Sequence, residues 1–170
     1  TSLSQEGTHL IELLHAAEIR ISAVFSPEHG FKGMADAGES LTDGIEPLTG
    51  SPIYSLYGKT RKPTREMLNG LDVLIFDMQD IGVRYYTYIS TLTLAIEAGA
   101  EKGIPVIVLD RLNPLGRDIK GPVLDIDFAS FVGMHPLPVR HGMTIGELAT
   151  MINEEGWLSG SVKAALKVMQ

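Results

Sequence analysis

The 170-residue sequence contains no cysteine, which excludes disulfides, thiolate zinc sites and a cysteine nucleophile. Basic residues are scarce as well. Lys and Arg total 14 against 21 Asp and Glu, so the formal net charge is −7. A chain this acidic is a poor candidate for non-specific binding to nucleic acid. No apolar run is long enough to span a bilayer, and no basic segment followed by an apolar stretch suggests a signal peptide.

Common cofactor and hydrolase motifs are also missing. The sequence has no Walker phosphate loop and no Gly-x-Gly-x-x-Gly fingerprint, so no nucleotide cofactor is predicted. It lacks the Gly-x-Ser-x-Gly elbow of serine hydrolases and the His-Glu-x-x-His zinc motif. We therefore predict neither a cofactor nor a resident metal.

Apolar residues make up 44% of the chain and charged residues 21%, which is enough to bury a core. Helix-spaced and strand-spaced apolar patterns alternate along the sequence. The predicted helices cover 9–18 (capped by Thr8), 64–69, 89–102 and 144–155, the last opening with a Thr144–Glu147 capping box. The predicted strands cover 19–25, 72–77 and 105–109, and a strand-like pattern occupies 162–169.

Buried strands separated by helices predict an α/β fold. The specific expectation is a Rossmann-like, mainly parallel sheet with helices on both faces. We interpret residues 1–170 as one Rossmann-like domain of a longer protein. The polar, glycine-rich segment 26–50 is long for a loop, and it is either a functional loop or a surface excursion.

Acidic residues follow each of the three main predicted strands. Glu28 comes after the first, Asp77 after the second and Asp110 after the third. Ligands of open parallel sheets bind outside the carboxyl ends of the strands, so we expect these three at one edge, around a polar pocket. The alternative for Asp77 and Asp110 is that they bind backbone N–H groups of the next turn.

Glu28 is the strongest candidate for chemistry. Pro27 stiffens the backbone before it and Gly30 frees the backbone after it, so a rigid turn sets its direction. A second carboxylate or partial burial would let it hold a proton near neutral pH, as a general acid must. The alternative is a structural ion pair with an arginine.

Other polar and aromatic residues near the strand ends could bind a ligand. Asp80 lies deeper in its loop, and His29 could tune Glu28 or contact a hydroxyl. Tyr85, Tyr86 and Tyr88 could stack on a sugar ring or pack in the core. The basic run Lys59, Arg61, Lys62 and Arg65 is either a solvated face or a region that attracts an anion.

Five strings, in this order and spacing, resemble the NamZ-type peptidoglycan exo-β-N-acetylmuramidase family, long catalogued only as a domain of unknown function. They are Phe25-Ser-Pro-Glu-His-Gly30, Ser55-Leu-Tyr-Gly58, Phe76-Asp-Met-Gln-Asp-Ile-Gly82, Tyr86-Thr-Tyr-Ile89 and Arg140-His-Gly-Met-Thr-Ile-Gly-Glu147. The resemblance implies an exported bacterial glycosidase, periplasmic or extracellular, that releases N-acetylmuramic acid from non-reducing ends of peptidoglycan fragments. It implies a Rossmann-like amino-terminal domain with a smaller second domain, and Glu28 as the central catalytic residue.

This resemblance and the strand-end pattern together give a set of expected site residues. The expected catalytic residues are Glu28, Asp77 and Asp110. The expected substrate-binding residues are His29, Asp80, Arg84, Tyr86, Tyr88, Arg111, Asn113, Arg140 and His141. A guanidinium can bind the lactyl carboxylate of muramic acid with two hydrogen bonds, and we favour Arg84 over Arg111 and Arg140 for that role.

The chain departs from the family at Leu112, where Asp-Arg-Pro-Asn-Pro is expected, and the family's opening strand and second domain are not found in it. Two other functions stay open. The acids could hydrogen-bond sugar hydroxyls in a non-catalytic glycan-binding domain. Asp77, Asp80 and Asp110 could instead hold magnesium in a phosphohydrolase.

Overall fold

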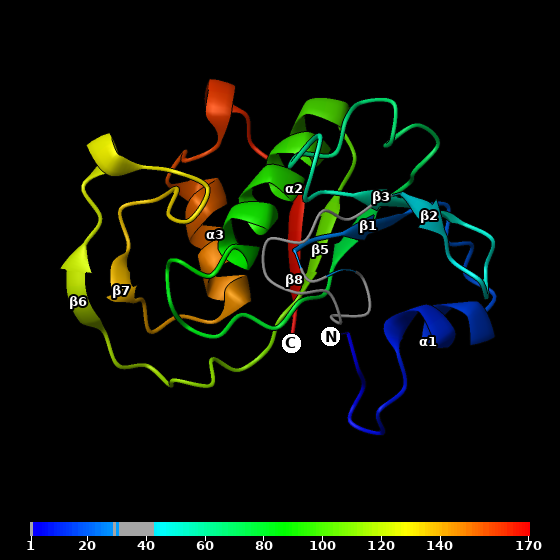
Figure 1. The fold of residues 1–170 in the computed structure, drawn as a ribbon, viewed down its shortest axis with the longest axis horizontal. Helices are drawn as coiled ribbons and strands as arrows, with labels where there is room; N and C mark the ends of the chain where they lie inside the picture. The colour runs from blue at the N-terminus through cyan, green and yellow to red at the C-terminus, as the bar shows by residue number, and fades with distance from the viewer. Residues whose placement is uncertain (1, 29, 31–42) are drawn as a thin grey trace. The chain divides into compact units, whose positions relative to one another are not determined.

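The structure is a computed structural model that describes residues 2–28, 30 and 43–170. The chain forms two compact units, Thr1–Leu71 and Asp72–Gln170. Figure 1 shows the elements of both. The assignment of residues 1–170 to one domain stays a prediction.

The first unit contains one helix and a three-stranded sheet. These elements are α1 (Leu10–Ala16), β1 (Val24–Ser26), β2 (Gly44–Ile45) and β3 (Pro52–Ser55). The strand order is β1-β3-β2, with β1 parallel to β3 and β2 antiparallel to it. Ser26 pairs with Ser55, so the segments that follow β1 and β3 leave the sheet at the same edge.

The second unit contains a fully parallel three-stranded sheet of order β4-β5-β8 and an antiparallel pair, β6-β7. Its elements, in chain order, are β4 (Leu74–Phe76), α2 (Tyr88–Lys102), β5 (Val106–Leu109), β6 (Lys120–Val123), η1 (Ile126–Phe128), β7 (Pro138–Arg140), α3 (Ile145–Glu154), η2 (Ser159–Ser161) and β8 (Leu166–Met169). Parallel strands alternating with helices confirm the predicted α/β class.

Helices α2 and α3 contact each other and the central strand β5, so both cover the same face of this sheet (Figure 1). Helix α1, in the other unit, is not placed relative to this sheet. Fully buried side chains fill the space between the two helices and the sheet: Leu92, Ile96, Val106, Val108, Leu148 and Ile152. Burying each of them contributes about 1.5–3 kcal/mol. Gly99 allows the close packing of α2 on β5, because a Cβ there would lie 2.4 Å from the Val106 side chain.

The sequence predicted the long helices closely. The predicted helix at 89–102 forms as Tyr88–Lys102 and ends at Gly103, whose φ is +76°. The predicted helix at 144–155 forms as Ile145–Glu154, with both hydrogen bonds of the capping box present. The predicted strands at 72–77 and 105–109 form as shorter central segments, and the strand-like carboxyl-terminal pattern forms β8.

Three local predictions were wrong. His9 caps α1, because its Nδ1 accepts from the Ile11 N–H. Thr8 does not cap the helix: its N–H donates to the Ser4 hydroxyl, and its carbonyl accepts from the Ser4 N–H. The strand predicted at 19–25 is limited to Val24–Ser26, the residues that pair with β3. Residues 64–69 form turns and no helix. A helix this short would gain few hydrogen bonds in return for the backbone dihedral angles that it fixes.

Candidate functional site

Glu28 lies just beyond β1, and its side chain accepts a hydrogen bond from the Tyr57 hydroxyl. The sheet explains the pairing, because β1 and β3 are parallel and the Leu56 N–H donates to the Ser26 carbonyl at 2.8 Å. The turn after Glu28 closes through a 3.1 Å bond from the Gly30 N–H to the Pro27 carbonyl, with a φ of +75° at Gly30. The predicted rigid turn around Glu28 is therefore present. The predicted ligand-binding residue His29 lies outside the described residues.

The environment of Tyr57 keeps its hydroxyl protonated. Burial raises the pKa of Tyr57, and the negative charge and hydrogen bond of Glu28 raise it further, whereas the nearby Arg61 guanidinium lowers it. A phenol with a raised pKa is a hydrogen-bond donor at neutral pH. One member of the predicted basic run, Arg61, is thus close enough to this pair to influence it.

The second unit brings Asp77 and Asp110 to one edge of its sheet, because β4 and β5 are parallel neighbours. Asp77 is buried, and Arg111 binds its Oδ1 through Nε at 2.9 Å and a terminal nitrogen at 2.5 Å. This geometry favours a supporting role for Asp77, since its charge is neutralised within the protein. Glu28 belongs to the other unit, so its distance from this edge stays a prediction.

Asp110 holds the start of α3. Its Oδ1 accepts from the backbone N–H groups of Arg111 and Gly146 at 2.9 and 2.7 Å, and its Oδ2 accepts from the Thr144 hydroxyl at 2.8 Å. An acidic side chain at a helix amino terminus is stabilised by the helix dipole. These contacts match the alternative expected for Asp110, in which it binds backbone N–H groups.

Asp80 and His141 form a buried pair. Nδ1 of His141 accepts from the Met143 N–H at 3.3 Å, which leaves the proton on Nε2, 3.1 Å from Oδ2 of Asp80. The same Oδ2 accepts from the Gly82 N–H at 2.7 Å, whereas Oδ1 is buried and has no hydrogen-bond partner among the described residues. This pair ties the loop after β4 to the segment before α3.

Asn113 joins the same two segments. Its side-chain amide donates to the Met143 carbonyl at 2.9 Å, and its Oδ1 accepts from the Leu115 N–H at 2.9 Å. Its side chain also packs on Gly82, where an added Cβ would lie 2.3 Å from the Asn113 Oδ1. The φ of +86° at Gly82 likewise favours glycine.

Two arginines proposed for the lactyl group contact backbone carbonyls. Arg84 donates to the carbonyls of Pro122 and Leu137 at 2.5 and 2.8 Å, which holds its guanidinium against the β6-β7 pair. Arg140 donates to the Leu115 carbonyl at 2.6 Å, and its buried Nε has no hydrogen-bond partner in the part of the chain that the structure describes. Each therefore has a structural partner in the second unit, and the assignment of a lactyl-binding arginine stays a prediction.

The tyrosine cluster divides between core and surface. Tyr88 is buried at the start of α2 and meets Tyr86 edge to face, with ring centroids 4.6 Å apart. Tyr86 is half-buried and Tyr85 is exposed. Core packing thus accounts for Tyr88, while Tyr86 and Tyr85 retain surface available to a ligand.

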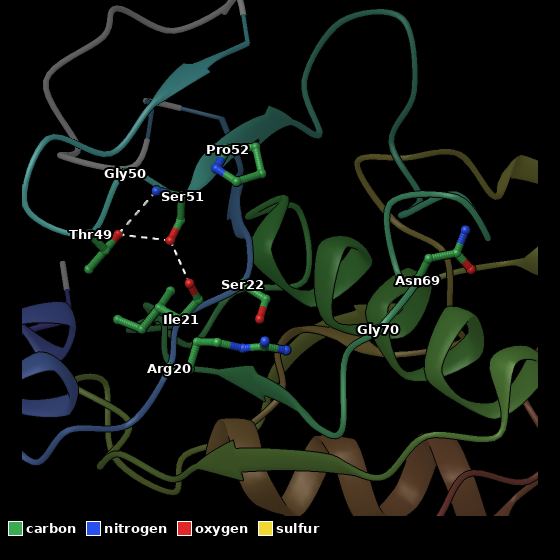
Figure 2. A pocket seen from close by; sticks show the side chains of 9 residues that line it. All are labelled: Arg20, Ile21, Ser22, Thr49, Gly50, Ser51, Pro52, Asn69 and Gly70. Atoms are coloured by element: carbon green, nitrogen blue, oxygen red, sulfur yellow. Dashed lines mark hydrogen bonds between the residues drawn. The ribbon is translucent and has the colours of Figure 1, made fainter.

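A hollow of about 450 Å³ lies in the first unit (Figure 2). The hollow is at the start of β1 and β3, whereas Glu28 follows the carboxyl end of β1. Its lining includes Ile21 before β1 and Ser51 before β3. The Ser51 hydroxyl donates to the Ile21 carbonyl at 2.5 Å and is itself bonded to Thr49. Because ligands of parallel sheets bind at the carboxyl ends of the strands, we do not assign the active site to this hollow.

No group of three or more His, Asp or Glu side chains among the described residues could hold a metal ion together, and Asp77, Asp80 and Asp110 thus form no such group. None of the helices in the described ranges is long and apolar enough to cross a membrane.

Residues 1–170 match the family described as exo-beta-N-acetylmuramidase NamZ, N-terminal. The chain belongs to this family. It is 55% identical over 139 residues to the peptidoglycan beta-N-acetylmuramidase NamZ of Bacillus subtilis strain 168, an alignment that covers 81% of this chain and 34% of that protein.

Two solved structures of DUF1343 family proteins from Bacteroides fragilis NCTC 9343 have the same fold. One is 44% identical with a TM-score of 0.90, over 100% of this chain and 42% of its own. The other is 39% identical with a TM-score of 0.84, over 97% of this chain and 43% of its own. The chain thus spans less than half the length of these relatives.

Sequence reasoning did not single out Tyr57 as a site residue of this NamZ-family chain. Tyr57 stood within the Ser55–Gly58 string, but no strand was predicted at 52–55. Recognising β3 as a parallel neighbour of β1 would have found Tyr57, because it follows β3 as Glu28 follows β1. Gln79 was also not among the predicted site residues; its side-chain amide donates to the Asp80 and Leu112 carbonyls.

Proposed function

We propose that the full-length protein containing this chain is an exo-β-N-acetylmuramidase. It removes N-acetylmuramic acid from the non-reducing ends of peptidoglycan fragments. The observation that carries this proposal is the 55% identity to a protein named peptidoglycan beta-N-acetylmuramidase NamZ, together with the family match over the whole chain. Because peptidoglycan lies outside the cytoplasm, we further propose that the enzyme acts as an exported protein.

Glu28 is the proposed acid/base of this reaction. Hydrolysis of a glycosidic bond requires proton donation to the leaving oxygen, and a carboxyl group usually supplies that proton. Glu28 is half-buried at the carboxyl edge of a parallel pair of strands, where ligands of such sheets bind. The rigid turn at Pro27–Gly30 fixes its backbone, as precise proton transfer requires.

The proposed substrate is anionic, since the lactyl group of muramic acid carries a carboxylate. The chain has a net charge of −7, so a local cation must offset the repulsion. Arg84, Arg111 and Arg140 remain the proposed readers of this group, and Arg61 adds positive charge beside Tyr57 in the first unit.

The proposal is tested by incubating the full-length protein with a β-linked disaccharide of N-acetylmuramic acid and N-acetylglucosamine. We expect free N-acetylmuramic acid to be released, because the lactyl carboxylate and the β-linkage are both recognised. A disaccharide of N-acetylglucosamine alone, which lacks the lactyl group, is the control. Binding of the muramic disaccharide without any release would show a glycan-binding domain instead of an enzyme.

A further inference from the structure

Tyr57 lies outside the predicted site set, follows β3 as Glu28 follows β1, and makes a side-chain hydrogen bond to Glu28. Resting on the function proposed above, we propose that Tyr57 is a positioning residue. It acts through Glu28, fixing the orientation of the carboxyl group and donating a hydrogen bond to the carboxylate that forms when Glu28 gives up its proton.

Both ends of this hydrogen bond are fixed by backbone contacts. On the Tyr57 side, the Ser55 hydroxyl accepts from the Tyr57 N–H at 3.2 Å and donates to the Tyr57 carbonyl at 3.3 Å. On the Glu28 side, Pro27 is buried and its carbonyl accepts from the Gly30 N–H. The Ser26–Leu56 backbone bond joins the two segments. The two side chains are therefore aligned before any substrate binds, which lowers the entropic cost of reaching a reactive geometry.

The direction of the hydrogen bond determines what Tyr57 contributes. Burial and the Glu28 charge both raise the pKa of Tyr57, so its O–H donates and the Glu28 carboxyl oxygen accepts. In the proposed step, the Glu28 proton passes to the glycosidic oxygen, which keeps the electron pair of its breaking bond to the anomeric carbon, and the oxygen of a water molecule then bonds to that carbon. Glu28 is left as a carboxylate. Tyr57 keeps its own proton and stabilises the new charge through the existing hydrogen bond.

The first test replaces Tyr57 with Phe in the full-length enzyme, which removes only the hydroxyl. A hydrogen bond to a charged group is worth about 1.5–3 kcal/mol, which corresponds to a loss of about 10- to 150-fold in kcat. We expect KM and the melting temperature to stay unchanged, since Tyr57 does not contact substrate in this account. Tyr54→Phe is the matched control: it removes a hydroxyl from β3, three positions before Tyr57, where Tyr54 packs against Phe25. A raised KM with unchanged kcat for Tyr57→Phe would contradict the proposal.

The second test asks whether Tyr57 acts through Glu28. If it does, Tyr57→Phe should cause no further loss of residual activity in a Glu28→Gln background, because the carboxylate that it stabilises is gone. An equal fold-loss in both backgrounds would show that Tyr57 acts independently of Glu28 and would overturn the proposal.

A third measurement does not depend on activity. Spectrophotometric titration of the tyrosines should show one phenol that ionises at lower pH in Glu28→Gln than in the wild type. That difference should vanish when Tyr57→Phe is present in both proteins. A tyrosine titration that is the same in Glu28→Gln and in the wild type would show that Tyr57 and Glu28 do not interact, and it would overturn the proposal. If the titration shows the pairing while the protein releases no N-acetylmuramic acid, the proposed function fails and the Tyr57–Glu28 interaction stands.

Discussion

His135 is a neutral histidine held inside the second unit. Its ring stacks on Trp157, with centroids 4.9 Å apart, and its Nε2 lies 2.8 Å from the Thr93 hydroxyl. The Thr93 hydroxyl proton is donated to the Ile89 carbonyl, so the histidine Nε2–H is the donor in this pair. Burial lowers the pKa of His135 from 6.5 to about 4.

This lowered pKa predicts a loss of stability in mild acid. Between pH 6.5 and about 4 the unfolded chain binds a proton at His135 and the folded chain does not, so the free energy of unfolding falls as pH falls. At about 1.4 kcal/mol per pH unit, the full effect is about 3 kcal/mol. Denaturant unfolding at several pH values measures it. His135→Gln, whose amide can still donate to Thr93, should show a shallower decline over this range.

The control is His15→Gln, which replaces an exposed histidine of α1. This variant should decline with pH as steeply as the wild type. Equal slopes for wild type and His135→Gln would show that burial of His135 does not contribute to acid sensitivity.

For single residues, the sequence predicted which side chains belong to polar clusters, but it did not predict which groups they contact. Asp110 follows its predicted strand as expected, yet its Thr144 and Gly146 contacts come from a segment more than 30 positions away. From the sequence, Arg84 is favoured for binding the lactyl carboxylate. Its observed contacts are the backbone carbonyls of Pro122 and Leu137. Such contacts depend on tertiary packing, which local sequence patterns do not encode.

The start of α3 is where local and tertiary contacts reinforce each other. The Thr144 hydroxyl accepts from the Glu147 N–H at 3.1 Å and donates to Asp110, while the Glu147 side chain accepts from the Thr144 N–H at 2.9 Å. Gly146 lets Asp110 approach, because a Cβ there would lie 2.6 Å from the Asp110 carboxyl carbon. The helix cap therefore also fixes the segment that follows β5.

Thr144→Ala removes both the cap and the bond to Asp110. We expect a loss of about 1–2 kcal/mol in the free energy of unfolding, the range of a helix cap plus one hydrogen bond. Thr150→Ala is the control within the same helix, because the Thr150 hydroxyl donates to the Gly146 carbonyl one turn earlier and does not cap the helix. That variant should change stability by no more than about 0.5 kcal/mol. Equal losses in the two variants would show that the cap has no special contribution.

Elements with strong local signals were predicted, and elements defined by their partners were not. Helix α2 and strand β5 have apolar periodicity ended by Gly103 and Pro105, so both were found. Strand β6 is exposed along its whole length and contains glycine and proline, and it exists because it pairs with β7. No periodic pattern in β6 alone could reveal that pairing. Segment 64–69 shows the reverse error: a local helix signal is present, but so short a segment forms turns instead of a helix.

For the whole molecule, the sequence established the class and the family more firmly than the assembled site. The α/β class followed from alternating element types, and the five strings gave the family that the comparison confirmed. The relation of Glu28 to Asp77 and Asp110 did not follow, because it requires the placement of one unit against the other. The relatives are also more than twice as long as this chain.

The central claim is that Glu28 performs the chemistry of muramic acid release, and Glu28→Gln in the full-length protein tests it most directly. Turnover of the muramic disaccharide and the dissociation constant for the same sugar should be measured side by side, with Glu6→Gln, an exposed substitution in the first unit, as the control. We predict a loss of turnover on the order of 100-fold or more, the usual scale for losing a general acid or base. Sugar affinity and melting temperature should be retained. Wild-type turnover in Glu28→Gln would contradict the account and remove Glu28 from the mechanism.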